Sequence, residues 1–216
     1  MKTKAKVNVK WLSCVAMLSA FAFIARLIFK IPVGFLTFDI KDTVIVLGGL
    51  IFGPISGLTI SLLTSLIEMI ISETGPIGFV MNFVSSATFA AVAALIYRLK
   101  RSFNGAIIGL FSSVGATTAV LLLMNLWLTP IYQGVPRSVV VTMLPMLLLF
   151  NFAKTLLNAA IVLLIYKPVV VALRRAGIVE GKSMGVKFGK QSIFTIVISA
   201  VSMVIAIVAL VIVHNM

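Results

Sequence analysis

Residues 147–166 read LLLFNFAKTLLNAAIVLLIY, an apolar stretch long enough to cross a bilayer that nevertheless holds one lysine and two asparagines. An ammonium group at that depth costs at least about 2.5 kcal/mol. On a helix, Asn151, Lys154 and Asn158 fall on one face, because residues three or four positions apart are neighbours. Such a face is turned toward other helices or a wet cavity. The stretch therefore predicts a membrane helix that holds something polar inside a bundle.

The composition of the whole chain supports this interpretation. Hydrophobic residues make up 61% of the 216 residues, charged residues make up 11%, and the mean hydropathy is +1.22. A soluble domain cannot hide that much apolar surface, because its exterior needs polar cover. We therefore predict an all-α integral membrane protein with six or seven spans and no separate soluble domain.

The net charge of +13 would suggest nucleic acid if it lay on one soluble face, but the basic residues gather in short connections between apolar segments. If the N-terminus is placed in the cytoplasm, thirteen basic residues lie in inner segments. Only three basic residues then lie in outer segments, namely Lys30, Lys41 and Arg137. This asymmetry predicts a cytoplasmic N-terminus, with membrane lipid rather than nucleic acid as the partner.

Apolar stretches separated by polar, glycine and proline residues predict seven spans: 11–29, 43–52, 56–71, 79–97, 105–128, 146–171 and 192–213. The first is long for the apolar core of a signal peptide, so we expect it to be retained. Pro145 is costly inside a helix, which predicts a short outer segment at 139–143 before the sixth span. Residues 1–175 would form a six-span domain, 176–191 a basic cytoplasmic linker, and 192–216 an extra C-terminal transmembrane helix.

The residue inventory argues against an enzyme. His214 is the only histidine and Cys14 the only cysteine, so neither a nucleophile with a nearby base nor a cysteine or histidine metal cluster is expected. The sequence also has no G-x-x-x-x-G-K-[ST] phosphate loop. We expect no catalytic residues and no metal site, and any energy for uphill transport must come from another subunit.

Polar and aromatic residues on the predicted outer side are the candidates for ligand binding. Asn82 and Asn125 lie near the outer ends of two spans, and Asp39 and Tyr132 lie in or beside outer loops. Amides, an ammonium and aromatic rings suit a flat, polar-edged heterocycle in an apolar pocket. The alternatives are snorkelling for Lys154, and hydrogen bonds between helices for Asn82 and Asn125.

Glu68 is the one carboxylate inside a predicted span. We expect it to form an internal pair with Arg26 or to sit near an outer boundary, with a proton relay as the other interpretation.

Four stretches resemble one known family. These are the A-x-x-x-A at Ala16 and Ala20, FLTFDIKD at 35–42, TGPIGFVMNF at 74–83, and NLWLTPIY at 125–132 followed by FNFAKTLLN at 150–158. The chain resembles the substrate-binding S components of energy-coupling factor (ECF) vitamin transporters, most closely those specific for riboflavin. The likeness covers roughly residues 8–175.

The resemblance implies a six-helix bundle in a prokaryotic plasma membrane, with riboflavin or an FMN-like flavin bound near the outer face. It also implies a transmembrane coupling subunit, docked on Ala16 and Ala20, and two cytoplasmic ATPases. The first outer loop would close over the ligand. On the family's pattern, the loop residues are Leu36, Thr37, Phe38 and Asp39, and the polar contacts are Asn125, Asn151 and Lys154.

The seventh span departs from the family, whose members usually end after the sixth helix. It leaves open how the chain docks with its partners. Two other functions stay open as well: an S component for another vitamin or a nucleobase-like compound, and a non-transporting membrane scaffold whose small-residue faces bind other helices.

Overall fold

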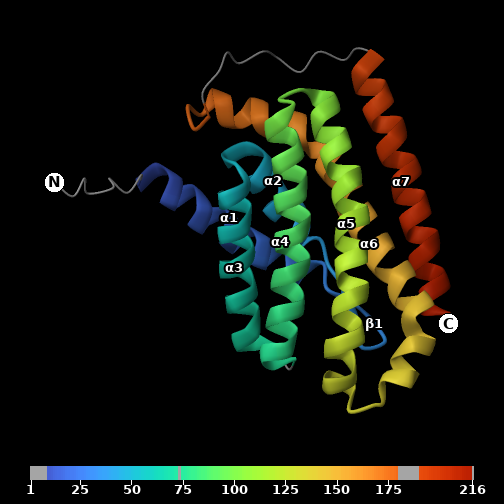
Figure 1. The fold of residues 1–216 in the computed structure, drawn as a ribbon. Coiled ribbons are helices and arrows are strands. Elements are labelled where there is room, and N and C mark those ends of the chain that lie inside the picture. Colours follow the sequence, from blue (N-terminus) through green and yellow to red (C-terminus); the bar gives the residue numbers. More distant parts are fainter. Residues whose placement is uncertain (1–8, 73, 180–189, 216) are drawn as a thin grey trace.

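The computed structural model describes residues 9–72, 74–179 and 190–215. Within these ranges the chain forms a bundle of helices and one short hairpin (Figure 1). The elements are α1 (Val9–Ile28), β1 (Ile31–Val33), β2 (Leu36–Phe38), α2 (Lys41–Phe52), α3 (Pro54–Ile71), α4 (Gly75–Leu99), α5 (Phe103–Gln133), α6 (Arg137–Arg175) and α7 (Lys190–His214). Six of these helices, all but α2, are long and apolar enough to cross a membrane. The predicted helical membrane fold with an additional C-terminal helix is confirmed.

The short helix α2 lies in the middle of the bundle. Its 12 residues give a length of about 18 Å, well below the roughly 30 Å of a bilayer core. It packs against α1, α3, α4 and α6. Nine of its residues are buried, as expected for a helix that is enclosed by others rather than by lipid. The prediction of a short span at 43–52 is therefore corrected: the helix begins at Lys41 and does not cross by itself.

Two helices run through prolines: α5 through Pro130, which was placed after the end of its span, and α6 through Pro145, which was expected to interrupt it. Helix α5 continues past the predicted end at residue 128, includes Pro130, and ends at Gln133, directly before Gly134, which has a φ of 64°. Helix α6 contains both Pro145 and Pro168, so the predicted break before residue 146 is wrong. Membrane helices tolerate proline because neighbouring groups satisfy the freed backbone. The ribbon of α6 bends instead, and its C-terminal part runs across one end of the bundle (Figure 1).

The connection between α1 and α2 contains an antiparallel hairpin that the sequence analysis did not predict. Ile31 pairs with Phe38, and Val33 pairs with Leu36. Two residues join the strands, and the first of them, Gly34, has a φ of 58°, as a tight turn of this kind requires. In Figure 1 the hairpin lies in the half of the bundle that holds the α3–α4 and α5–α6 turns.

Helix α7 packs along α6 at the edge of the bundle (Figure 1). Its buried face carries small residues whose positions in the sequence are alternately four and three residues apart. Isoleucines and valines cover the opposite face. Small residues let two membrane helices approach closely. Of the predicted basic linker 176–191, residues 180–189 lie outside the described part of the chain. The buried small residues of α7 are Thr195, Ser199, Ser202, Ala206 and Ala209.

Glycines set the spacing between the central helices. A Cβ atom at Gly57 would lie 3.1 Å from the Cα of Gly49 and 3.0 Å from the Cβ of Ala90, so α2, α3 and α4 nearly touch there. A Cβ atom at Gly109 would lie 2.7 Å from the backbone oxygen of Ala93. Because a backbone atom cannot move aside as a flexible side chain can, Gly109 fixes the contact between α4 and α5.

We expect Gly109→Ala to lower the stability of the protein by about 1–3 kcal/mol, because the added methyl group pushes α5 away from α4. The control is Gly115→Ala in the same helix, where a Cβ meets nothing within 4 Å. It should be neutral or slightly stabilising. Thermal unfolding can be followed with a thiol-reactive dye, since Cys14 is the only cysteine and is buried. Equal melting temperatures for the two variants would contradict this account of the α4–α5 contact.

Candidate ligand-binding site

A pocket of about 490 Å³ opens between the hairpin and the ends of α1, α3, α4 and α5, with α6 as a further wall. This volume lies within the usual range for small-molecule sites. Eight of the ten residues predicted to bind substrate line it, although they come from four different segments. They are Leu36, Thr37, Asp39, Asn82, Asn125, Tyr132, Asn151 and Lys154.

Two predicted residues do not line the pocket. Phe38 is 5% exposed and belongs to the apolar core, because side chains alternate along the strand and its neighbour Thr37 faces the other way. Asn158 lies one helical turn beyond Lys154, away from the pocket wall, and its side chain is engaged by the protein itself.

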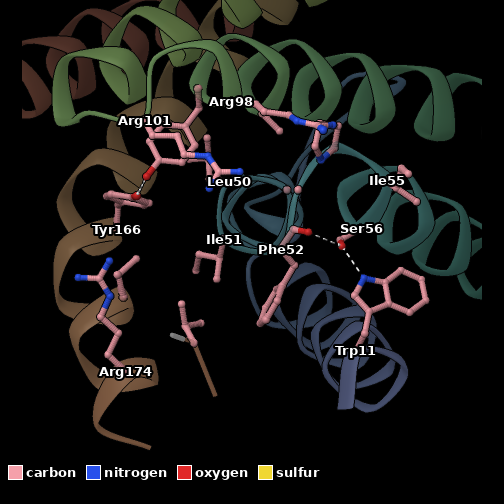
Figure 2. A pocket seen from close by; sticks show the side chains of 17 residues that line it. Trp11, Leu50, Ile51, Phe52, Ile55, Ser56, Arg98, Arg101, Tyr166 and Arg174 are labelled. Atoms are coloured by element: carbon pink, nitrogen blue, oxygen red, sulfur yellow. Dashed lines mark hydrogen bonds between the residues drawn. The ribbon is translucent and has the colours of Figure 1, made fainter. Parts of the chain in front are cut away.

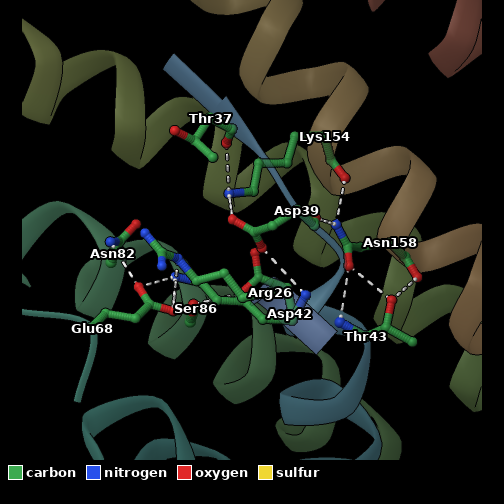
Figure 3. Close-up of polar contacts among 11 residues, drawn as sticks. Arg26, Thr37, Asp39, Asp42, Thr43, Glu68, Asn82, Ser86, Lys154 and Asn158 are labelled. Atoms are coloured by element: carbon green, nitrogen blue, oxygen red, sulfur yellow. Dashed lines mark hydrogen bonds and ion pairs between the residues drawn. The ribbon is translucent and has the colours of Figure 1, made fainter. Parts of the chain in front are cut away.

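The hairpin is tied to α6 through Asp39. The Nζ of Lys154 lies 3.0 Å from Oδ2 of Asp39 and also donates to the backbone oxygen of Thr37 at 3.4 Å (Figure 3). Burial alone would raise the pKa of the Asp39 carboxyl, but the ammonium groups of Lys154 and Lys41 lower this pKa below its ordinary value. Asp39 is therefore ionised, and the ion pair with Lys154 persists at neutral pH.

Asn158 makes a second tie between the same segments. Its Nδ2 donates to the backbone oxygen of Asp39 at 3.1 Å and to that of Lys154 at 3.0 Å. Its Oδ1 accepts from the backbone nitrogen of Thr43 at 2.9 Å and from the Thr43 hydroxyl at 2.8 Å. All the functional atoms of this amide are occupied, so Asn158 holds the start of α2 against α6.

A second set of charges lies beside the first (Figure 3). The carboxylate of Glu68 lies 2.6 Å from Nζ of Lys41, 3.4 Å from Nε of Arg26 and 2.9 Å from Nδ2 of Asn82. The predicted pair between Glu68 and Arg26 is confirmed, although Lys41 is the nearer cation. The predicted alternative for Asn82, a hydrogen bond between helices, is also observed. Asn82 lines the pocket as well and thus connects the wall to this ion cluster.

Sequence reasoning missed the role of Lys41 and Asp42. Both were read as part of an outer connection, yet each is 1% exposed. Asp42 accepts a hydrogen bond from Ser86 of α4. The signal in the sequence was the small number of acidic residues, five in the whole chain. Three of these acids, Asp39, Asp42 and Glu68, face three basic side chains here. Burial of charge demands such compensation.

Two asparagines on facing helices differ in how far the protein satisfies them. Asn125 donates to the backbone oxygen of Leu121 and accepts from Thr129, both in its own helix and both at 2.8 Å. Asn151 lines the pocket, is 6% exposed, and its Nδ2 has no hydrogen-bond partner. A buried amide without a partner is costly, so Asn151 carries an unused donor within a residue of the pocket wall.

The apolar part of the wall was also unforeseen. Leu27, Phe35, Met81, Leu121, Leu128 and Phe150 contribute to it. These residues carry no distinguishing pattern in an apolar sequence, because every span offers many similar side chains. Their placement beside a few polar groups makes the pocket suitable for a largely flat, amphipathic molecule.

Comparison with known proteins decides the family. A model of the ECF transporter substrate-specific component matches residues 10–166. This chain belongs to that family. It is therefore a substrate-binding component of a transporter and not an enzyme, and it is a multi-pass membrane protein.

Individual relatives agree with this assignment. The S component is 30% identical to the riboflavin transporter RibU of Staphylococcus aureus (strain TCH60) over 81% of this chain and 100% of the relative. It is 30% identical to the riboflavin transporter FmnP of Bacillus subtilis (strain 168) over 55% of this chain and 66% of the relative. A solved structure of the S component of a bacterial ECF transporter superimposes with a TM-score of 0.67 at 31% identity, covering 78% of this chain and 99% of that chain.

We expect Glu68→Gln to destabilise the S component by about 3–5 kcal/mol, because it leaves Lys41 and Arg26 buried without their shared counter-ion. The double variant Lys41→Met/Glu68→Gln also removes the nearer cation and should recover part of that loss, since only Arg26 then lacks its counter-ion. Thermal unfolding in detergent, followed by the reaction of Cys14 with the thiol-reactive dye, measures both. A double variant no more stable than Glu68→Gln alone would contradict a direct pair between the two side chains.

Proposed function

We propose that this S component binds riboflavin in the pocket between the hairpin and α4–α6, and that it mediates riboflavin uptake together with an ECF coupling subunit and two ATPases. The observation that carries the proposal is the unpartnered Nδ2 of Asn151 in the pocket wall. The names of the two relatives, both riboflavin transporters, support the choice of ligand.

The chemistry of the wall supports a flavin. The isoalloxazine ring carries carbonyl oxygens and ring nitrogens at its edge, which match the amide donors and acceptors of Asn151 and Asn125. The remainder of the ring is flat and apolar and would pack against Leu36, Met81 and Phe150. Burial of apolar ligand area contributes about 25 cal/mol per Å² before the costs of binding.

The hairpin would act as the cover of the pocket. Leu36 and Thr37 lie in the wall, and Asp39 anchors the strand to α6 through Lys154. Closing the pocket excludes water and strengthens its polar contacts. In this proposal Lys154 acts mainly by positioning the hairpin, because its ammonium already has a carboxylate partner.

The orientation follows from the charges. In the proposed arrangement the N-terminus is cytoplasmic and the pocket faces the exterior, since α1 begins at the end where Arg98, Arg101 and Arg174 lie. The pocket lies at the opposite ends of the same helices.

The proposed docking surface for the coupling subunit is the face of α1 that carries Ala16 and Ala20. Both residues are exposed, and they are flanked by exposed Leu12, Met17 and Phe21. A small-residue pair with apolar neighbours lets another membrane helix pack closely.

We expect Asn151→Leu to weaken riboflavin binding by about 1–3 kcal/mol, roughly 5- to 150-fold, while the melting temperature without ligand stays the same or rises. The substitution removes an amide that would bind the ligand, but it breaks no hydrogen bond of the Asn151 Nδ2 within the protein, because that atom has no partner there. Titration of the detergent-solubilised protein, followed by quenching of flavin fluorescence, measures the affinity.

The matched control is Asn158→Leu in the same helix. This variant leaves several buried partners unsatisfied, so we expect a lower melting temperature without ligand. Unchanged riboflavin affinity in Asn151→Leu would count against the proposed site. A panel of other vitamins and nucleobases, measured in the same way, tests whether the ligand is riboflavin.

We expect Ala16→Leu/Ala20→Leu to abolish co-purification with a coupling subunit while riboflavin affinity changes less than about twofold, because α1 would be held away from its partner helix. The control Met17→Leu/Phe21→Leu changes the same face without filling the small-residue groove. Retained assembly in the alanine variant would show that the partner docks elsewhere.

A further inference from the structure

A second pocket, of about 690 Å³, lies at the opposite end of the bundle from the ligand pocket. It is formed by the start of α1, the α2–α3 turn, the end of α4 and the last turns of α6 (Figure 2). The proposed uptake function makes no use of it. Its lining contains Arg98, Arg101 and Arg174 and no carboxylate.

These three guanidinium groups have no counter-ion in the described part of the chain. No ion pair joins Arg98, Arg101 or Arg174 to an acid among residues 9–72, 74–179 and 190–215. The Nε of Arg174 is buried and has no hydrogen-bond partner. Arg98 and Arg101 are exposed, whereas the buried guanidinium nitrogen of Arg174 lacks an acceptor, which is costly and would be relieved by an anion in the pocket.

The rest of the lining identifies the kind of anion. Tyr97 and Tyr166 meet through their hydroxyl groups at 2.7 Å, and Trp11 donates to the Ser56 hydroxyl at 2.8 Å (Figure 2). Tyrosine and tryptophan gather at the level of lipid headgroups. Below them the wall is apolar, and Ile55 at its edge is 71% exposed. A cationic rim above an apolar wall fits an anionic amphiphile better than a fully hydrophilic ion.

We propose that this pocket binds a phosphate-bearing anion, with the phosphate between Arg101 and Arg174 and, when the anion is a phospholipid, an acyl chain along the wall beside Ile55. Planar guanidinium groups bind phosphate oxygens in pairs. Basic pockets between membrane helices are known to hold anionic headgroups. The site would couple the end of α6 to the composition of the surrounding lipid.

The test uses Trp11 as a reporter inside the pocket. Trp11 and Trp127 are the two tryptophans of the chain, so Trp127→Phe leaves Trp11 alone. The full chain is placed in nanodiscs that contain phosphatidylglycerol or phosphatidylcholine with brominated acyl chains. We expect the brominated phosphatidylglycerol to quench Trp11 preferentially, and the preference to fall about fivefold for each arginine removed in Arg101→Gln/Arg174→Gln.

The matched control is Lys100→Gln/Arg175→Gln, which removes two charges from the adjacent, exposed positions at the same end. It should keep the preference. Thermal unfolding, followed by the reaction of Cys14 with the thiol-reactive dye, shows whether each variant is folded. Relief of quenching by inorganic phosphate, but not by chloride at equal ionic strength, would support the site and assign it to a soluble phosphate compound.

Two results would overturn the proposal. One is equal quenching by the two lipids without any effect of phosphate, which would leave the pocket as a contact for a protein partner. The other is the same loss of preference in the control variant, which would assign the effect to the overall charge of this end. Neither result bears on riboflavin binding, which is measured at the other end of the helices.

Discussion

The position of Asp39 governs the ligand pocket. This buried residue joins the hairpin to α2, and α6 binds it twice, through the ammonium of Lys154 and through the amide of Asn158. The first contact places the hairpin over the pocket, and the second places the start of α2 in the centre of the bundle. One residue therefore sets both the cover of the pocket and the packing beneath it, although its two partners lie more than a hundred positions away in the sequence.

Charge compensation makes such an arrangement possible inside a membrane. Arg26, Lys41 and Lys154 are matched by the same number of carboxylates close by, so the cluster as a whole is nearly neutral. An isolated charge would cost several kcal/mol in this surrounding, whereas a compensated network costs much less. The network also explains why a helix as short as α2 can begin inside the protein: each of its first three residues, Lys41, Asp42 and Thr43, has a partner in α3, α4 or α6.

The two ends of the bundle consequently differ in electrostatic character. In the buried ion cluster at the hairpin end, three acids face three bases, and the pocket wall beside it holds the unpartnered amide nitrogen of Asn151. At the opposite end, arginines line a pocket whose described residues include no acid, and the Nε of Arg174 has no hydrogen-bond partner. Helix α7 lies along α6, which contributes to both pockets, and so adds to the bundle without covering the exposed alanines of α1.

The sequence by itself determined the membrane class and the order of the long helices, and it pointed to eight of the residues that line the candidate pocket, because hydropathy and the cost of polar groups in lipid are local properties. It did not determine the partners of those residues. The position of Pro145 predicted a break, but α6 is continuous through it. Lys41 was placed in an outer connection, but in the structure it forms an ion pair with Glu68 of α3. Only the tertiary structure decided that Lys154 is held by Asp39 while Asn151 stays unpaired, because that depends on which distant segments the bundle brings together.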